Sequence, residues 1–306
     1  MPSSLDLRGV YVPLVTPLTA SGAVALDEVV RLAHECLSSG AAGIVALGTT
    51  GEPATLEKDE HRAVVDVIAG VCRETSAMLL IGAGTNSTSA TIAAVKAANE
   101  VAGVSAILSV VPYYTRPSEA GIVAHFQAVS QASRVPVVLY NIPYRTGRGL
   151  GARSLLMLAA TANVAGVKQS VGGVDADTLE LLANKPAGFS VLSGDDAFLF
   201  PLLCLGGSGA IAASAHFCTA GFVALVEAVR KGDVETGRQV AEMLLPVCQV
   251  LFVEPNPSVI KGVLAAQGRI STDQLRSPMT SASAESVRAA VEAVTRAEVA
   301  LAERLS

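Results

Sequence analysis

The chain has 306 residues, of which 51% are hydrophobic, 16% charged and only 4% aromatic, and tryptophan is absent. This composition can bury a large aliphatic core. The formal net charge of −5, without a basic run, argues against nucleic acid or an anionic membrane as a partner. The N-terminus lacks the pattern of a secretory signal, and no uncharged apolar run reaches the ~20 residues of a membrane span. A cytoplasmic enzyme that acts on small molecules is therefore expected.

Eight short apolar runs follow one another, each succeeded by turn residues and a helical pattern. Near-continuous apolarity without alternation is typical of strands buried on both faces, as in parallel sheets. Eight such units predict a closed (β/α)8 TIM barrel, with an open doubly wound sheet as the alternative. The predicted strands are Val10–Val15, Gly43–Leu47, Met78–Gly82, Ala106–Val110, Pro136–Tyr140, Val164–Val167, Phe189–Leu192 and Ala210–Ala213.

Only helical patterns remain after about residue 225, at Phe222–Arg230, at Val234–Val253 and from Ser258 to the end of the chain. They predict a C-terminal helical bundle that offers a place for contacts between subunits. The expected domains are a catalytic barrel over residues 1–225 and a helical domain over residues 226–306.

Function in a (β/α)8 barrel lies at the carboxyl ends of the strands. Here these ends carry hydroxyls, phenols and one lysine, without histidine or cysteine, so neither a metal site nor a serine–histidine triad is expected. The segments concerned are Gly48–Glu52, Pro112–Tyr114, Tyr140–Pro143, Lys168 and Ser193–Asp196.

Lys168 follows the apolar run Val164–Val167, so its amine is expected to point into a barrel lined by aliphatic side chains. Burial disfavours the charged form of an amine. A neutral amine can attack a ketone to give an iminium, which makes the adjacent methyl carbon acidic. The alternative interpretation is a salt-bridged lysine, or one whose ammonium reaches solvent.

Hydroxyl side chains at the other strand ends could complete such a site. Tyr140 could exchange protons near the amine, and Thr49 could link it to Tyr114 as a proton relay. Thr50 and the glycine-flanked amides around it could hold a small carboxylate. The alternatives are tyrosines buried only for packing and glycines that serve only to turn the chain.

Taken together, these motifs resemble those of the dihydrodipicolinate synthase / N-acetylneuraminate lyase family of class I Schiff-base aldolases. The resemblance extends from Val15-Thr16-Pro17 to the C-terminal helices. The motifs that carry it are Gly48–Glu52, Gly84–Asn86, Pro112–Tyr114 with Arg116-Pro117, Tyr140–Pro143, Gly166–Lys168, Ser193–Asp196 and Gly206–Gly209.

The resemblance implies that Lys168 forms a Schiff base with pyruvate and that Tyr140 moves protons during imine formation. It implies that Thr49 and Tyr114 complete the relay and that Tyr113 lies at a tight subunit interface. One of these two neighbouring tyrosines crosses from the adjacent subunit in the family, so a homodimer or homotetramer is expected.

The remaining substrate contacts also come from the resemblance. Thr50 is expected to bind the pyruvate carboxylate, and the backbone carbonyls of Gly194 and Ile211 are expected to face the substrate. No metal or organic cofactor is implied.

Arg145, just beyond the strand that ends at Tyr140, separates the subfamilies. A guanidinium there can pair with a second carboxylate, and the synthases of the family carry an arginine at this place. The resemblance therefore implies condensation of pyruvate with aspartate 4-semialdehyde to 4-hydroxy-tetrahydrodipicolinate, in lysine and diaminopimelate biosynthesis. The alternative is a pyruvate-dependent aldolase acting on a 2-keto-3-deoxy sugar acid, on sialic acid or on another aldehyde.

Some residues depart from the family pattern and keep that alternative open, namely Gln169, Ser170, Thr115 and Asn256–Val259. In lysine-inhibited members, an acidic residue early in the helix after the Gly84–Asn86 motif holds the effector's ammonium. Ser87–Thr91 contains no carboxylate, so weak or absent inhibition by lysine is expected.

Overall fold

The computed structural model describes residues 5–305, and its strands follow the order β1 to β8 in a closed parallel barrel. The predicted fold class is thereby confirmed, and each predicted apolar run overlaps one strand. The strands are β1 Gly9–Pro13, β2 Gly43–Ala46, β3 Met78–Gly82, β4 Val104–Val110, β5 Val137–Asn141, β6 Val164–Gln169, β7 Ser190–Ser193 and β8 Gly209–Ile211.

The clearest difference from the predicted strands is at β6, which continues through Lys168 and Gln169. Both side chains are buried, so this strand is covered on both faces to its end. Polar residues end an apolar run in a sequence, whereas the backbone continues to pair with β5 and β7. The apolar pattern therefore predicted the strand but placed its end two residues too early.

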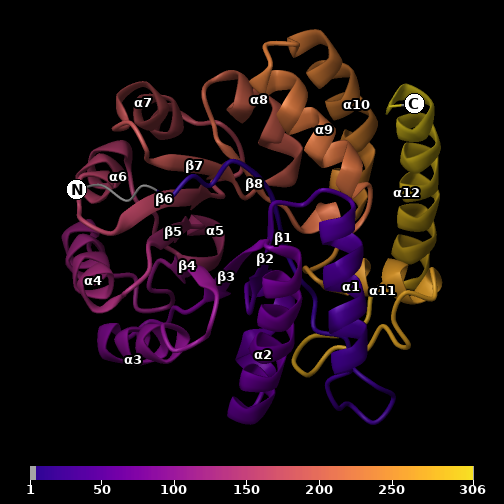
Figure 1. Cartoon of the computed structure of the whole chain (residues 1–306), viewed down its shortest axis with the longest axis horizontal. Helices are drawn as coiled ribbons and strands as arrows, with labels where there is room; N and C mark the ends of the chain where they lie inside the picture. Colours follow the sequence, from indigo (N-terminus) through magenta and orange to yellow (C-terminus); the bar gives the residue numbers. More distant parts are fainter. Residues whose placement is uncertain (1–4, 306) are drawn as a thin grey trace. The chain divides into compact units, whose positions relative to one another are not determined.

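The chain forms two compact units, the first of which comprises residues 5–9 and Met78–Ile211. Strands β5 and β6 are buried along their whole length, as expected for parallel strands with helices on one side and a barrel interior on the other. Figure 1 shows the larger helices of this unit on the outer side of its strands. The helices are α3 Thr88–Ala98, α4 Glu119–Ala132, α5 Pro143–Thr146, α6 Ala152–Ala159, α7 Ala176–Asn184 and α8 Leu199–Cys204.

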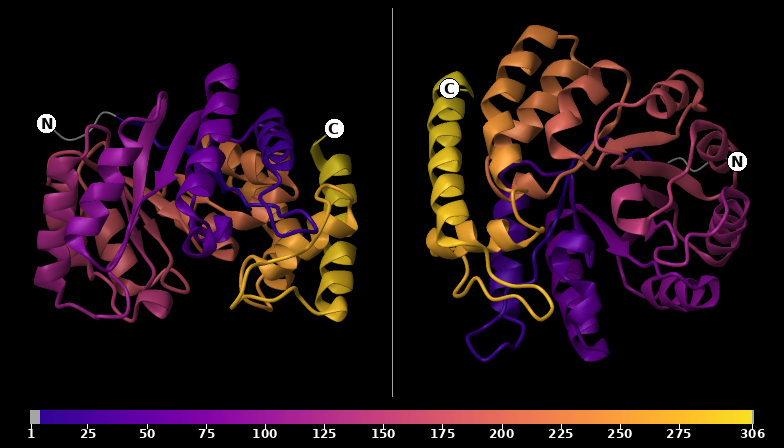
Figure 2. Two further views of the ribbon diagram at one scale, coloured as in Figure 1. Left: turned by 90° about the horizontal axis from the view of Figure 1, so that it is seen from below. Right: turned by 180° about the vertical axis from the view of Figure 1, so that it is seen from behind.

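The second unit joins the segment Val10–Ala77 to residues 212–305. Figures 1 and 2 show α12 beside α10 and α11, and Gly262 permits this approach because a Cβ there would lie 2.5 Å from a methyl of Val287. The predicted division at residue 225 stays a prediction. The helices are α1 Leu26–Ser38, α2 Lys58–Thr75, α9 Thr219–Arg230, α10 Val234–Val250, α11 Ser258–Ala266 and α12 Ala284–Leu305.

Within residues 5–305, none of the helices combines the length and the apolar character that crossing a membrane requires.

Candidate active site

The ends of β5 and β6 bring Tyr140 and Lys168 together. The two residues are paired in the register of these parallel strands, so their side chains point to the same face of the sheet. The Lys168 Nζ lies 4.2 Å from the centroid of the Tyr140 ring. Only 7% of Lys168 and 6% of Tyr140 are exposed. A primary amine is thus held against a phenol in a region almost closed to bulk water.

Gly194, directly after β7, provides the space that the lysine side chain occupies. A Cβ built on Gly194 would lie 2.7 Å from Lys168 Cε and 2.8 Å from its Cγ, and it would overlap the hydroxyl of Ser170. Any other residue would displace the lysine. The predicted site residue Gly194 therefore lies beside the amine.

Two further polar groups near this amine were not singled out as site residues from the sequence. The Ser170 hydroxyl is fully buried and has no hydrogen-bond partner among the residues that the structure describes. Burial raises the pKa of the Asp195 carboxyl, while the Gly172 N–H, 2.7 Å from Asp195 Oδ2, and the charge of Lys168 oppose this shift. Neither residue type signals a function alone, and only the fold brings both to the end of the lysine strand.

A buried hydrogen-bond network fixes the two strand ends from behind. The Asn141 side-chain amide donates to Gln169 Oε1 at 3.0 Å, and Gln169 Nε2 donates to Thr178 Oγ1 at 3.0 Å. The Thr178 hydroxyl in turn donates to Asp175 at 2.6 Å. An amide at position 169 accepts one bond and donates the next, which an ionised carboxylate could not do. The departure from the family pattern at Gln169 is thus accommodated within this network.

Arg145 lies in the short helix α5, and its neighbour Tyr144 orients it. Arg145 Nε donates to the Tyr144 hydroxyl at 2.9 Å, and the guanidinium carbon lies 5.2 Å from the centroid of the Tyr144 ring. Partial desolvation raises the pKa of the Tyr144 phenol, against the opposing effects of the Arg145 charge and hydrogen bond. Both side chains are exposed, so the two terminal nitrogens of the guanidinium remain accessible to a carboxylate.

Tyr114 adopts a left-handed backbone conformation with φ 68° and exposes 87% of its surface. Arg116, two residues later, is also left-handed, with φ 47°. Such conformations are strained for residues other than glycine. The turn therefore presents Tyr114 outward, and Tyr113 is 39% exposed beside it.

Thr49 and Thr50 form a 3-10 turn, η1 Thr49–Gly51, after β2 in the second unit. Thr50 is 2% exposed, and its hydroxyl oxygen accepts a hydrogen bond from Asn256 Nδ2 at 3.0 Å. The Gly51 carbonyl accepts from the Thr16 hydroxyl at 2.8 Å. Thr49 is half-buried. The turn is thus held from both sides by side chains distant in sequence.

The last predicted contact, Ile211, is fully buried at the end of β8. The structure thus brings Lys168, Tyr140 and Gly194 together, with Arg145 and Tyr144 on the helix that follows β5. Residues 5–305 contain no group of three or more histidine, cysteine or acidic side chains arranged to hold a metal ion.

Comparison with known proteins gives concordant matches. The model of the dihydrodipicolinate synthetase family matches residues 6–297. The 4-hydroxy-tetrahydrodipicolinate synthase of Neisseria gonorrhoeae is 37% identical over 290 residues, which cover 94% of this chain and 98% of that protein.

Two solved structures are similar over nearly their whole length. The 4-hydroxy-tetrahydrodipicolinate synthase of Methylacidiphilum fumariolicum superposes with a TM-score of 0.92 at 32% identity, covering 97% of this chain and 98% of that one. The chloride-inhibited dihydrodipicolinate synthase of Acinetobacter baumannii was solved in complex with pyruvate. It superposes with a TM-score of 0.91 at 30% identity, and the match covers 96% of this chain and 99% of that one.

Proposed function

This chain belongs to the dihydrodipicolinate synthetase family, and we propose that it is a lyase that condenses pyruvate with aspartate 4-semialdehyde. The 4-hydroxy-tetrahydrodipicolinate synthases to which this chain is similar support this activity. The observation that carries the proposal is the buried amine of Lys168 against the Tyr140 phenol.

The first step is imine formation at Lys168. The neutral amine adds to C2 of pyruvate, and the ketone oxygen leaves as water after it has gained protons. Tyr140, 4.2 Å from the amine by its ring centroid, is the group placed to carry those protons. Near-complete burial of Lys168 protects the iminium from bulk water.

Carbon–carbon bond formation follows from the iminium. Loss of a proton from C3 gives an enamine, and C3 then forms a bond to the aldehyde carbon while the aldehyde oxygen gains a proton. The amino group of the semialdehyde attacks C2, displaces the lysine and closes the ring. Arg145, with its terminal nitrogens exposed and its Nε bonded to Tyr144, binds the carboxylate of the second substrate.

The remaining site residues have proposed roles that follow the family pattern. The Thr50 hydroxyl donates a hydrogen bond to the pyruvate carboxylate, and Thr49 with Tyr114 extends the proton relay from Tyr140. The carbonyls of Gly194 and Ile211 face the substrate. This chemistry uses a covalent lysine–pyruvate imine and requires no metal or organic cofactor.

Trapping with borohydride tests the imine. Borohydride added with pyruvate should reduce the iminium and leave a covalent adduct on Lys168, located by peptide mass spectrometry. Lys168→Ala should give no adduct, whereas Lys96→Ala, which removes an exposed lysine of α3, should give the full amount. Absence of the adduct from the folded wild-type protein would overturn the proposal.

A product assay tests the second substrate. We expect turnover of pyruvate with aspartate 4-semialdehyde and no cleavage of sialic acid or 2-keto-3-deoxygluconate. The reverse pattern would leave the imine chemistry intact and assign the protein to the sugar-acid aldolases.

A mixed-subunit assay tests the assembly. We propose a homodimer or homotetramer in which the exposed Tyr114 enters the site of the neighbouring copy. Lys168→Ala and Tyr114→Phe should each be inactive alone and regain activity when their subunits are mixed and allowed to exchange. If exchanged subunits stay inactive, Tyr114 does not act across an interface.

Lysine regulation and location stay predictions. Ser87 caps α3 through the Ala90 N–H, and the Thr88 hydroxyl is hydrogen-bonded to His125. The start of this helix therefore presents hydroxyls and no carboxylate to an ammonium. Lysine is expected to inhibit weakly or not at all, and the protein is expected in the cytoplasm.

A further inference from the structure

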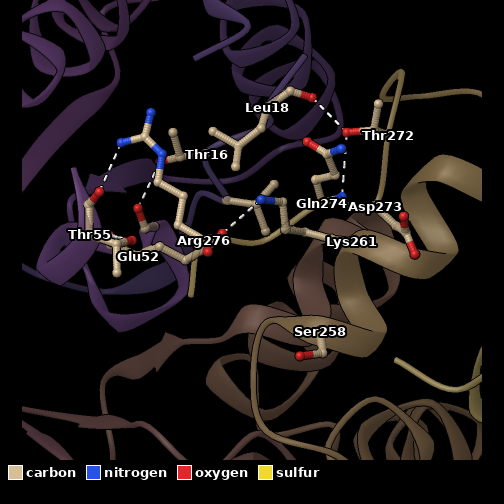
Figure 3. A network of polar contacts seen from close by, with 12 residues as sticks. Thr16, Leu18, Glu52, Thr55, Ser258, Lys261, Thr272, Asp273, Gln274 and Arg276 are labelled. Atoms are coloured by element: carbon tan, nitrogen blue, oxygen red, sulfur yellow. Dashed lines mark hydrogen bonds and ion pairs between the residues drawn. The ribbon is translucent and has the colours of Figure 1, made fainter. Parts of the chain in front are cut away.

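The turn after β2 is fastened to the C-terminal part of the second unit by a buried ion pair. Lys261, on α11, is fully buried, and its Nζ lies 2.7 Å from Glu52 Oε1. Figure 3 shows the two side chains pointing toward one another from segments far apart in the sequence. Glu52 has a left-handed backbone, with φ 55°. This pair fixes the backbone that immediately follows Thr49–Gly51.

A second contact from the same C-terminal segment reaches Thr50 itself. Asn256 Nδ2 lies 3.0 Å from the Thr50 hydroxyl oxygen, in the second unit. An amide nitrogen can only donate, so the threonine oxygen must act as the acceptor in this bond. The hydroxyl proton of Thr50 is then left for another acceptor.

The direction of that proton matters because a carboxylate only accepts hydrogen bonds. A buried hydroxyl can bind a carboxylate when its proton points to the ligand, and it cannot when the proton is given to a protein acceptor. Thr50 is 2% exposed, so neighbouring side chains set the orientation of its hydroxyl. Because Asn256 donates to the Thr50 oxygen, it does not offer an acceptor that would compete with the substrate for the Thr50 proton.

We infer that Asn256 is a positioning residue that holds Thr50 as a hydrogen-bond donor to the carboxylate of the 2-keto acid substrate. The inference rests on the proposed function, because it assigns a reason for the orientation of a proposed substrate ligand. Asn256 itself does not touch the reacting atoms. The C-terminal segment thereby takes part in substrate affinity through one amide.

A double-mutant cycle tests this inference directly. The half-saturating concentration of pyruvate for borohydride trapping is measured in the wild type, Asn256→Ala, Thr50→Val and the double variant. Asn256→Ala should raise this concentration about tenfold, because hydrogen bonds to charged groups are the stronger ones and this one becomes misoriented. The maximal extent of trapping should be unchanged.

The double variant gives the discriminating result. If Asn256 acts only through Thr50, adding Asn256→Ala to Thr50→Val should change the half-saturating concentration by less than about twofold. Additive effects in the cycle, or no effect of Asn256→Ala alone, would overturn the inference. Absence of any adduct in the wild type would instead refute the proposed function.

Two further variants separate positioning from a general effect on folding. Ser258→Ala removes the hydrogen bond from Ser258 to the Thr280 carbonyl in the same segment and should leave pyruvate affinity unchanged. If Asn256→Ala does not fold, Asn256→Asp takes its place in the cycle. It keeps the shape but offers an acceptor to the Thr50 proton, so pyruvate should bind more weakly, and unchanged affinity would contradict the inference.

Discussion

The end of the β5–β6 pair and the turn after β2 both carry proposed substrate residues, but they are stabilised in different ways. Lys168 and Tyr140 are held by strand register and by a hydrogen-bond network behind them. The turn at Thr49–Gly51 is held by side chains from Thr16 and from the C-terminal segment. The first region therefore depends on the pairing of neighbouring strands, and the second on side-chain contacts, of which the one from Asn256 spans 206 residues.

This difference separates two kinds of mutational effect. A change at the strand pair should remove chemistry and leave the fold largely intact, because neighbouring strands hold the backbone. A change around the turn should affect stability and substrate affinity together, because the polar side chains themselves hold the backbone.

Tyr140→Phe should give a large effect on rate with little effect on stability. Loss of a positioned acid–base group lowers turnover by about 10²–10⁴-fold. The thermal midpoint should hardly change, because the ring still fills its place between the strands. Steady-state kinetics and a thermal melt measure the two quantities, and a thermal midpoint that falls in parallel with activity would show that the strand pair also controls stability.

Lys261→Met should give the largest effect on stability. Removal of one partner leaves Glu52 buried without its counter-charge, which costs about 3–5 kcal/mol of unfolding free energy. The double variant Lys261→Met/Glu52→Gln should recover much of this loss. Urea unfolding measures both.

An exposed ion pair provides the matched control for that experiment. Arg62 and Asp66 are paired on α2, with exposed side-chain fractions of 82% and 54%. Arg62→Ala should cost no more than about 0.5 kcal/mol. A comparable loss in the two variants would show that burial does not distinguish the two pairs.

His216, also in the second unit, should make stability depend on pH. It is 1% exposed, and its two ring nitrogens bond the Val15 N–H and the Ala213 carbonyl. Burial lowers the pKa of His216 from 6.5 to about 4. The unfolded chain therefore binds more protons between these values, so stability is full above pH 6.5 and falls as the pH drops toward 4.

The size of this effect follows from the change in pKa. The unfolding free energy should fall by about 3 kcal/mol across that interval in the wild type. His216→Gln should lack this part of the slope. Urea unfolding at a series of pH values measures it, and equal slopes in the two proteins would rule out His216 as the source.

Tyr144→Phe should give the smallest effect, on affinity for the second substrate. The ring remains under the guanidinium, and only the bond from Arg145 Nε is lost. The KM for aspartate 4-semialdehyde should rise by up to about tenfold, as for one hydrogen bond, while the KM for pyruvate stays constant. An equal rise in both would show that Tyr144 supports the whole site.

The sequence predicted the parts of this protein that depend on local pattern. Apolar runs marked the strands, and the order of the strands placed Tyr140 beside Lys168, because β5 and β6 are neighbours. It did not predict the end of β6, since Gln169 is polar yet buried in a network that only the fold assembles.

The contacts of the turn after β2 could not be predicted either. Asn256 and Lys261 lie more than two hundred residues from their partners. No periodicity links positions so far apart, and neither residue type is specific alone. The resemblance implied that Tyr113 or Tyr114 reaches a neighbouring subunit, but the left-handed backbone that exposes Tyr114 could not be predicted, because it depends on the turn as a whole.

The missing side chain at Gly194 has a consequence for how the amine could be blocked. A single methyl group at position 194 would collide with the carbon chain of the Lys168 side chain. The protein would then block its own amine without any bound inhibitor. Every reactive atom would still be present, but the carbon chain of Lys168 and the Ser170 hydroxyl would have to move. A substitution at Gly194 would therefore act on the position of the amine and not on its chemical identity.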